Sequence, residues 1–192
     1  MNWGSRLTIA ALYLIGALIV GALVHFAIVL TIPLVATRDA YARLAEFGPV
    51  LATSPLPRAD ASGKALPYSD PAVASAFCRF DLTGGPVRVR APKGRAGFAS
   101  LSFHSRRGAA FYAFTDRAAT HGFMEAVIVT PKQLRALVAQ DDEDNPSEDL
   151  RIASPATEGF VLVRVFSELP SLYPAAEAQA RALSCTREPA DK

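Results

Sequence analysis

The sequence predicts an α+β protein: one N-terminal transmembrane helix, then a mainly antiparallel β domain (a sandwich or half-barrel) with a short middle helix and a C-terminal helix. Two observations predict this fold class. Near the N-terminus lies one uncharged apolar run that is long enough to cross a bilayer. Beyond residue 76, short segments alternate apolar and polar residues between closely spaced turns, which is typical of antiparallel strands.

The apolar run predicts a membrane anchor. No charged side chain occurs between Leu7 and Thr37, and about 20 apolar residues suffice to cross the hydrocarbon core. The competing interpretation is a cleavable signal peptide, whose apolar region is normally about 7–15 residues long and precedes a small-x-small site. Leu34-Val35-Ala36 matches that site poorly. We therefore expect an uncleaved signal anchor in contact with the lipid bilayer.

Two features of this run bear on function. His25 is its sole ionisable residue, and an intramembrane polar group is a functional candidate by default. The alternative is a neutral imidazole bonded to a neighbouring helix or a water. Ala17 and Gly21 form a small-xxx-small pair, which allows a homodimer through the membrane helix.

Opposing observations bear on orientation. Arg6 is outnumbered by Arg38, Arg43 and Arg58 beyond the run, which by the positive-inside rule favours a cytoplasmic domain. The two cysteines and the lack of a polybasic cytoplasmic tail favour the outside. We expect the extracytoplasmic orientation, because a long domain can be translocated despite flanking charges.

Four regions are expected along the chain. They are the transmembrane anchor with a juxtamembrane helix (1–47), a Pro/Ala/Ser-rich linker (48–67), the soluble β-rich domain (68–187) and a tail (188–192). The juxtamembrane helix follows from the helical spacing of apolar residues in 38–47. The linker follows from its prolines and small residues.

Within the β-rich domain, periodicity predicts each element in order. Asp70-Pro71 is a helix-start signal and predicts a turn of helix over 72–76. Strands are predicted at 76–82, 86–91, 98–104, 109–115, 123–130, 150–153 and 159–167, the first two as a hairpin. Thr130-Pro131 starts the middle helix over 132–139, and Tyr173-Pro174 starts the terminal helix that reaches about Ser184.

Two cysteines suggest one disulfide. Cys78 lies at the start of the first strand and Cys185 just after the last helix, so a bridge would join both ends of the domain. An ordinary buried thiol at Cys78, in the apolar set with Phe80 and Leu82, is the alternative. Because disulfides persist in oxidising compartments, the bridge is tied to the extracytoplasmic orientation.

Two segments, CRFDLTGGPVRVRAP (78–92) and GFASLSFHSRRGAAFYAFTDRAA (97–119), resemble the bacterial family called domain of unknown function 1254. The anchor followed by RDAYARL also resembles short, membrane-anchored members of that family. The resemblance implies a β-rich domain and a membrane protein. It brings no established activity and no catalytic residue. Longer relatives carry a second domain of unknown function, which we do not expect here.

No catalytic, cofactor-binding or metal-binding set is assigned. His104, His121, Asp116 and Glu125 would need to converge to bind a metal, and no HxH or HExxH spacing is present. The better interpretation of His104 and His121 is that they are solvent-facing or locally hydrogen-bonded histidines. Ser102 shares a strand face with His104, but a GxSxG nucleophile motif is absent.

Charge is placed unevenly. Residues 79–117 are strongly basic, and 141–149 carries six carboxylates in nine residues. One interpretation is a face that binds an anionic ligand; the other is a solvated strand face partly matched by the acidic loop. The candidate residues are Arg79, Arg88, Arg90, Arg106 and Arg107. Outside the anchor, basic and acidic residues nearly balance, which argues against a nucleic-acid partner.

These observations predict a membrane-tethered accessory or binding domain of the bacterial envelope, on the periplasmic side of the inner membrane. Its expected partner is another envelope protein or an anionic ligand. The alternative is an enzyme acting on a small or anionic substrate in a sheet-lined pocket. A deep pocket that gathers His104, Asp116 and another polar group would favour the enzyme.

Overall fold

A computed structural model describes residues 3–35, 39–58, 70–94, 97–141 and 147–188. The chain divides after Thr37 into two compact units. The first contains the helix α1 (Trp3–Val35). Its segment Trp3–Ile32 has a mean hydropathy of 2.5 and is long and apolar enough to cross a membrane, a test that an anchor and a signal sequence both pass.

The second unit, hereafter the folded unit, contains two β-sheets. The five-stranded sheet has the order β1-β2-β8-β4-β5, and all its neighbouring strands are antiparallel. Its strands are β1 (Thr53–Pro55), β2 (Val73–Asp81), β8 (Glu158–Phe166), β4 (Ala99–Ser105) and β5 (Ala110–Thr115). The four-stranded sheet has the order β7-β6-β3-β9, and only β6 and β7 are parallel. Its strands are β7 (Arg151–Ala153), β6 (Phe123–Val129), β3 (Val87–Pro92) and β9 (Ser184–Arg187).

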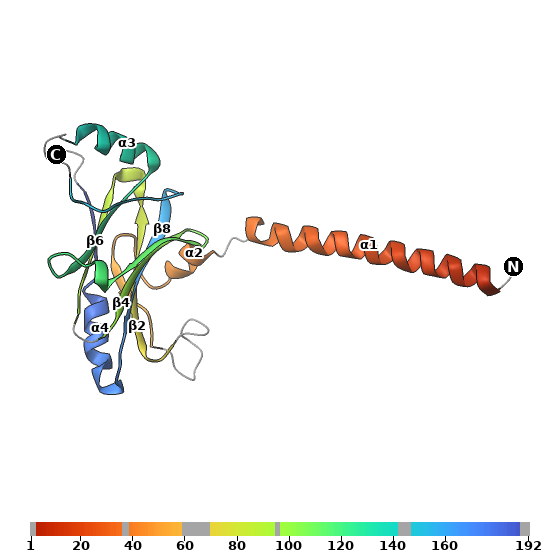
Figure 1. Cartoon of the computed structure of the whole chain (residues 1–192), viewed down its shortest axis with the longest axis horizontal. Helices are drawn as coiled ribbons and strands as arrows, with labels where there is room; N and C mark the ends of the chain where they lie inside the picture. Colours follow the sequence, from red (N-terminus) through yellow and green to blue (C-terminus); the bar gives the residue numbers. More distant parts are fainter. Residues whose placement is uncertain (1–2, 36–38, 59–69, 95–96, 142–146, 189–192) are drawn as a thin grey trace. The chain divides into compact units, whose positions relative to one another are not determined.

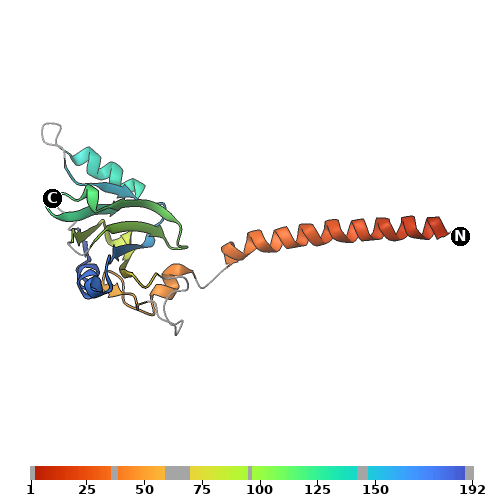
Figure 2. The same cartoon turned by 60° about the horizontal axis from the view of Figure 1, so that its bottom comes forward.

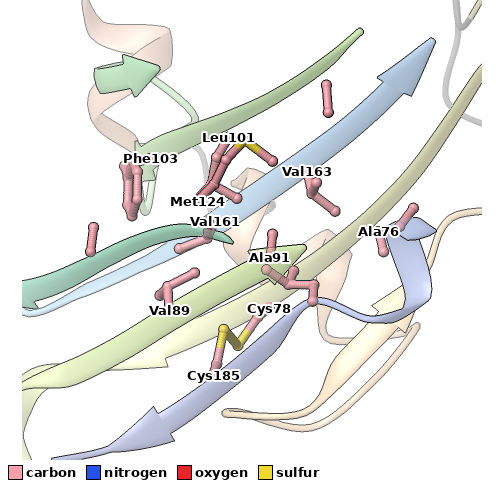
Figure 3. Close-up of a cluster of buried hydrophobic side chains, with 14 of the residues drawn as sticks. Ala76, Cys78, Val89, Ala91, Leu101, Phe103, Met124, Val161, Val163 and Cys185 are labelled. Atoms are coloured by element: carbon pink, nitrogen blue, oxygen red, sulfur yellow. A yellow bond between two sulfur atoms is a disulfide. The ribbon is translucent and has the colours of Figure 1, made fainter. Parts of the chain in front are cut away.

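The main core lies between the two sheets. Alternate residues of β2, β4 and β8 face alternate residues of β3 and β6, and Figure 3 shows these side chains interleaved. Phe80, Leu101, Phe103, Met124 and Val161 are all fully buried. The predicted α+β class with a mainly antiparallel sandwich is therefore confirmed.

Two helices occupy opposite ends of the folded unit (Figure 1). The middle helix α3 (Pro131–Gln140) begins at Thr130, whose hydroxyl accepts from the Gln133 N–H in a capping box, as its sequence predicts. The terminal helix α4 (Tyr173–Arg181) buries Tyr173, Ala176 and Ala180 in the main core. Short 3₁₀ turns lie at Leu82–Gly84, Asp116–Ala118 and Pro170–Leu172.

Three local predictions are corrected. Residues 72–76 form no helix, because the Asp70 carboxylate accepts from the Ala72 N–H in a tight turn and β2 starts at Val73. The strands at 76–82 and 86–91 form no hairpin, because the turn at Leu82–Gly84 carries the chain from one sheet to the other. The terminal helix ends at Arg181, and Cys185 lies on β9, an edge strand too short for a periodicity signal.

The expected division into anchor helix and linker is also corrected between residues 39 and 58, hereafter the covering segment. Its helix α2 (Ala40–Leu44) and its strand β1 belong to the folded unit. Leu44 and Leu56 pack with Phe77, Phe160 and Leu162 in a second, smaller core on the outer face of the five-stranded sheet. Figure 2 shows α2 on that unit. The remainder of the expected linker (59–67) and residues 189–192 of the tail lie outside the described residues.

Candidate functional site

The outer face of the five-stranded sheet carries a cavity of about 390 Å³, hereafter the groove. Its floor comes from β8 and the neighbouring β4, and its wall comes from the covering segment. The lining residues include Arg43, Leu44, Glu46, Phe47, Leu56, His104, Phe160, Leu162 and Arg164. All of them belong to the folded unit.

Strand alternation builds the floor. On β8, Val161 and Val163 point into the main core, so Phe160, Leu162 and Arg164 point outward. The register sets Phe160 opposite His104 and Leu162 opposite Ser102. The His104 and Phe160 rings stack with centroids 4.8 Å apart. The floor is thus apolar, with one guanidinium at one end and an imidazole at the other.

Polar contacts fasten the wall to the sheet. The Asp39 carboxylate accepts from the Ala42 N–H at the start of α2 and pairs with Arg106 in the β4–β5 turn at 2.6 Å. Two guanidinium groups lie over the Tyr41 ring, that of Arg79 at 4.8 Å from the ring centroid and that of Arg106 at 5.7 Å. Against the burial that raises it, the Ala42 N–H and Arg106 hold the pKa of Asp39 below its usual range. A charged Asp39 therefore holds α2 in place at neutral pH.

Charged groups line the groove without being neutralised. The side chains of Arg43 and Arg164 make no ion pair or hydrogen bond with any residue that the structure describes, and both are exposed. The carboxylate of Glu46 has no such partner either among the described residues. The lining therefore carries two guanidinium groups against one carboxylate.

His104 is locally bonded and neutral. Burial lowers its pKa, and the charge of Arg164 acts in the same direction. A carbonyl can only accept, so Nδ1–H donates to the Gly108 oxygen at 3.0 Å. Nε2 then accepts from the Ser102 hydroxyl at 2.9 Å. This is the geometry of a serine–histidine pair, yet Ser102 is buried and does not line the groove.

The other residues considered for a metal site do not converge. His121 is exposed in a turn at φ 51°, and Glu125 lies on the other sheet, where it pairs with Arg88 at 2.7 Å. Asp116 does not line the groove. Across the described ranges, no three His, Cys, Asp or Glu side chains are grouped to hold a metal ion.

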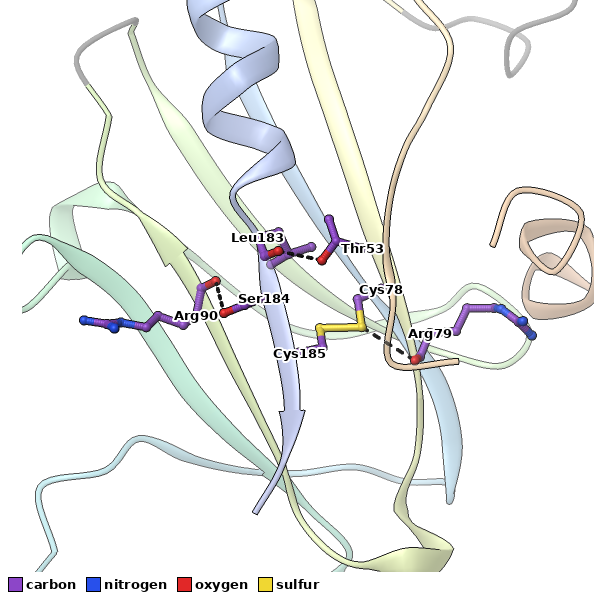
Figure 4. Close-up of a disulfide and its surroundings, with 7 residues drawn as sticks. All are labelled: Thr53, Cys78, Arg79, Arg90, Leu183, Ser184 and Cys185. Atoms are coloured by element: carbon purple, nitrogen blue, oxygen red, sulfur yellow. Dashed lines mark hydrogen bonds between the residues drawn. A yellow bond between two sulfur atoms is a disulfide. The ribbon is translucent and has the colours of Figure 1, made fainter. Parts of the chain in front are cut away.

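The five arginines proposed for an anion-binding face do not share one face, which corrects that expectation. Arg79 points outward from β2 and Arg90 from β3, and because these strands lie in different sheets the side chains extend in opposite directions (Figure 4). Arg79 is buried and donates to the Gly48 carbonyl at 2.8 Å. Arg106 is engaged by Asp39 and Glu158, whereas Arg107 is exposed on the β4–β5 turn.

A second cavity, of about 630 Å³, lies on the outer face of the four-stranded sheet. Arg88 at its edge pairs with Glu125, Asp149 and Glu188, and Arg151 pairs with Asp141 at 2.6 Å. Hydrogen bonding by Arg88 lowers the pKa of Asp149. In the described part of the acidic loop, Asp149 thus pairs with Arg88 of the basic strand β3, whereas Asp141 pairs with Arg151 of β7.

One disulfide joins the two sheets. Cys78 on β2 and Cys185 on β9 have Cα atoms 6.5 Å apart, within the range that a disulfide requires. Both are buried beside Val89 and Ala91 (Figure 3), and Figure 4 shows the bond between their sulfur atoms. The predicted bridge is therefore present, although it joins strand to strand. His25 lies in α1 with its ring 6.2 Å from that of Phe26, and its function and the homodimer stay predictions.

The sequence contained one signal for the groove that the prediction did not use. In GFVLVRVFS, Phe160 and Leu162 are apolar on the face opposite to Val161 and Val163. A strand that is apolar on both faces is covered on both faces, which indicates a second layer over β8. Nothing in the sequence identified the covering segment as that layer.

Comparisons with known proteins give a family and a fold. The family model described as "Protein of unknown function (DUF1254)" matches residues 52–187. No curated protein matches the chain. The VPA0106 protein from Vibrio parahaemolyticus has a crystal structure similar to this chain, with a TM-score of 0.53 and 12% identity over 77% of this chain and 34% of its own.

An uncharacterised protein from Burkholderia cenocepacia is 14% identical, with a TM-score of 0.46 over 77% of this chain and 39% of its own. The chain thus spans little more than a third of either solved structure. The similarity to the Vibrio parahaemolyticus protein supports the fold alone.

Proposed function

Because this chain belongs to the DUF1254 family of proteins of unknown function, we propose a function from its own geometry: it is a membrane-tethered binding domain of the bacterial envelope. In this proposal α1 anchors the chain in the inner membrane and the folded unit lies in the periplasm. The groove on the five-stranded sheet is its ligand site.

The groove is the observation that carries the proposal. Its volume of about 390 Å³ lies in the range of small-molecule sites, which are mostly apolar with a few polar groups that set orientation. The apolar floor and the charged ends match that description.

The disulfide supports the proposed location. Cys78 and Cys185 are paired in the core, and such bridges are rare in the cytosol of mesophiles. α1 supports the anchor by its length and composition. Together they favour a tethered domain that faces an oxidising compartment.

The alternative is an enzyme that uses the same groove. The hydrogen bond between Ser102 and His104 favours it, because a histidine that accepts a serine proton activates a nucleophile. Against it, the Ser102 hydroxyl is buried outside the lining of the groove, so a substrate there would not reach it. Binding is therefore the better supported activity.

Membrane attachment and orientation are tested in cells. The chain with a C-terminal epitope is expected to stay full-length in the membrane pellet after a carbonate wash. External protease should remove the epitope from spheroplasts but not from intact cells. A soluble form that starts near Thr37, or an epitope cut only after lysis, would contradict the anchor or the orientation.

Binding is tested with the full chain in phosphatidylcholine nanodiscs and decanol carrying a terminal photoreactive diazirine. Mass spectrometry should locate labelling at groove residues such as Phe47 and Leu162. Ala40→Phe, which fills the groove, should abolish this labelling. Ala45→Phe, on an exposed position outside the lining, should not. Labelling without preference for the groove would refute the binding site.

A further inference from the structure

The groove combines two kinds of surface within one cavity. Leu44, Phe47 and Leu56 of the covering segment and Phe160 and Leu162 of β8 supply apolar contacts. Arg43 and Arg164 supply charge. A ligand that satisfies both surfaces must itself have an apolar part and an anionic part.

We propose that the groove binds a single-chain amphiphilic anion, a carboxylate or phosphate headgroup on an apolar chain, with Arg43 and Arg164 as its headgroup ligands. This inference rests on the proposed function of the groove as a binding site. The two arginines reach the groove from different elements, Arg43 from α2 and Arg164 from β8. A planar guanidinium donates two parallel N–H bonds to a carboxylate or phosphate, which is the geometry that an anionic headgroup requires.

Position distinguishes these two arginines from the others. Arg88, Arg106, Arg151 and Arg181 each pair with a carboxylate of the folded unit, whereas Arg107, Arg117 and Arg135 pair with none among the described residues but do not line the groove. Arg43 and Arg164 have no partner among the described residues, although both lie beside an apolar cavity. Unpaired cations at the edge of a low-dielectric cavity attract an anion more strongly than the same cations on an open surface.

Two neighbouring side chains restrict where in the groove the anionic headgroup can bind. His104 is uncharged and its two ring nitrogens are engaged by Gly108 and Ser102, so it offers the headgroup neither charge nor a free donor. Glu46 repels an anion, so its removal should strengthen binding. The apolar chain is left to contact Phe160 and Leu162.

The size of the groove limits the kind of apolar chain that the ligand can carry. At about 390 Å³ it is near the lower limit for small-molecule sites, which suits one acyl chain better than a two-chain phospholipid. α2 is also the first element after α1 along the chain. An amphiphile is therefore a ligand whose chemistry fits both the cavity and a membrane-tethered domain.

The test uses the full chain in phosphatidylcholine nanodiscs and three diazirine probes of equal chain length, decanoate, decanol and decyltrimethylammonium. Decanoate should label the groove with about tenfold higher apparent affinity than decanol, the effect of roughly one charge-assisted hydrogen-bonding pair. The cation should label it least. Nanodiscs without protein give the lipid background.

Variants of the lining residues distinguish contacts with the headgroup from binding of the apolar chain. Arg43→Gln/Arg164→Gln should remove the preference for decanoate over decanol, whereas Arg43→Lys/Arg164→Lys should keep part of it. Glu46→Gln should raise the affinity for decanoate a few-fold, by roughly the energy of one partly screened charge pair. Arg107→Gln, an exposed arginine outside the lining, is the matched control and should change nothing. Retention of the disulfide on non-reducing gels checks that each variant is folded.

The outcomes distinguish the two proposals. Labelling of the groove by decanol and decanoate with equal affinity, insensitive to the glutamine variants, would overturn the anionic ligand and leave the binding site standing. No labelling of the groove by any probe would overturn the proposed function. Competition by lysophosphatidic acid but not by inorganic phosphate would support the amphiphile, and competition by inorganic phosphate alone would overturn it.

Discussion

Reduction of the Cys78–Cys185 disulfide is expected to lower the free energy of unfolding of the folded unit by about 5 kcal/mol. The two residues are 107 positions apart, so the bridge closes a loop of roughly that length in the unfolded chain. In the chain-entropy model, a loop of about 100 residues corresponds to about 4.7 kcal/mol at 25 °C. The bridge also joins β2 to the edge strand β9, so the four-residue β9 depends on it more than a central strand would.

The measurement is urea unfolding of the full chain in non-ionic detergent, followed by pulse proteolysis with and without a phosphine reductant. With a slope of about 2 kcal/mol per molar urea, the midpoint should fall by about 2 M or more. Because both sulfurs stay in the core, the reduced protein isolates the cross-link. Cys78→Ala/Cys185→Ala adds the loss of buried sulfur packing and should be less stable still.

Two results would refute this reasoning. One is an unchanged midpoint after complete reduction, which would mean that the cross-link adds nothing to stability. The other is thiol labelling of both cysteines in the native, non-reduced protein, which would also remove the main support for the periplasmic location.

Two further predictions concern the backbone conformation at two glycines and the ionisation of one carboxylate. Gly97→Ala should destabilise by about 3 kcal/mol, because φ is 139° there and a Cβ would collide with the Phe166 carbonyl. Gly122→Ala, at φ 81° with open space around it, should cost only about 1 kcal/mol in the same unfolding assay, and equal costs would contradict the steric argument. The Thr83 N–H lowers the pKa of Asp81 from its ordinary 3.8, so its contribution to stability is complete above that value and is lost as the pH falls through the lowered pKa. Asp81→Asn should therefore be less stable than wild type at pH 7, and the difference should shrink as the pH falls below 3.8; a difference that stays constant as the protein is acidified would exclude this linkage.

Strand alternation is the property that could be predicted from sequence most fully. β4, β5, β6 and β8 begin and end within a residue or two of their predicted positions, because successive side chains of a strand point to opposite faces and turn residues mark the ends of each segment. The α3 start followed from Thr130 and Pro131, since an N-cap and a proline at the first helical position act within one turn, and the structure adds the capping box with Gln133. The long helix α1 was also predictable, because its uncharged apolar run can be recognised from composition alone.

Only the tertiary structure decided what depends on contacts between distant segments. The turn at Leu82–Gly84 is as compatible with a hairpin as with a crossing between sheets, and the sheet order alone distinguishes them. That order sends Arg79 and Arg90 to opposite sides, so a basic run in the sequence became no single face. The covering segment reads as an anchor extension and a linker until the Asp39–Arg106 pair and the packing of Leu44 on Phe160 are known. The groove, with Arg43 and Arg164 about 120 residues apart in the chain, exists only because that segment folds onto β8, and no local pattern records so distant a contact.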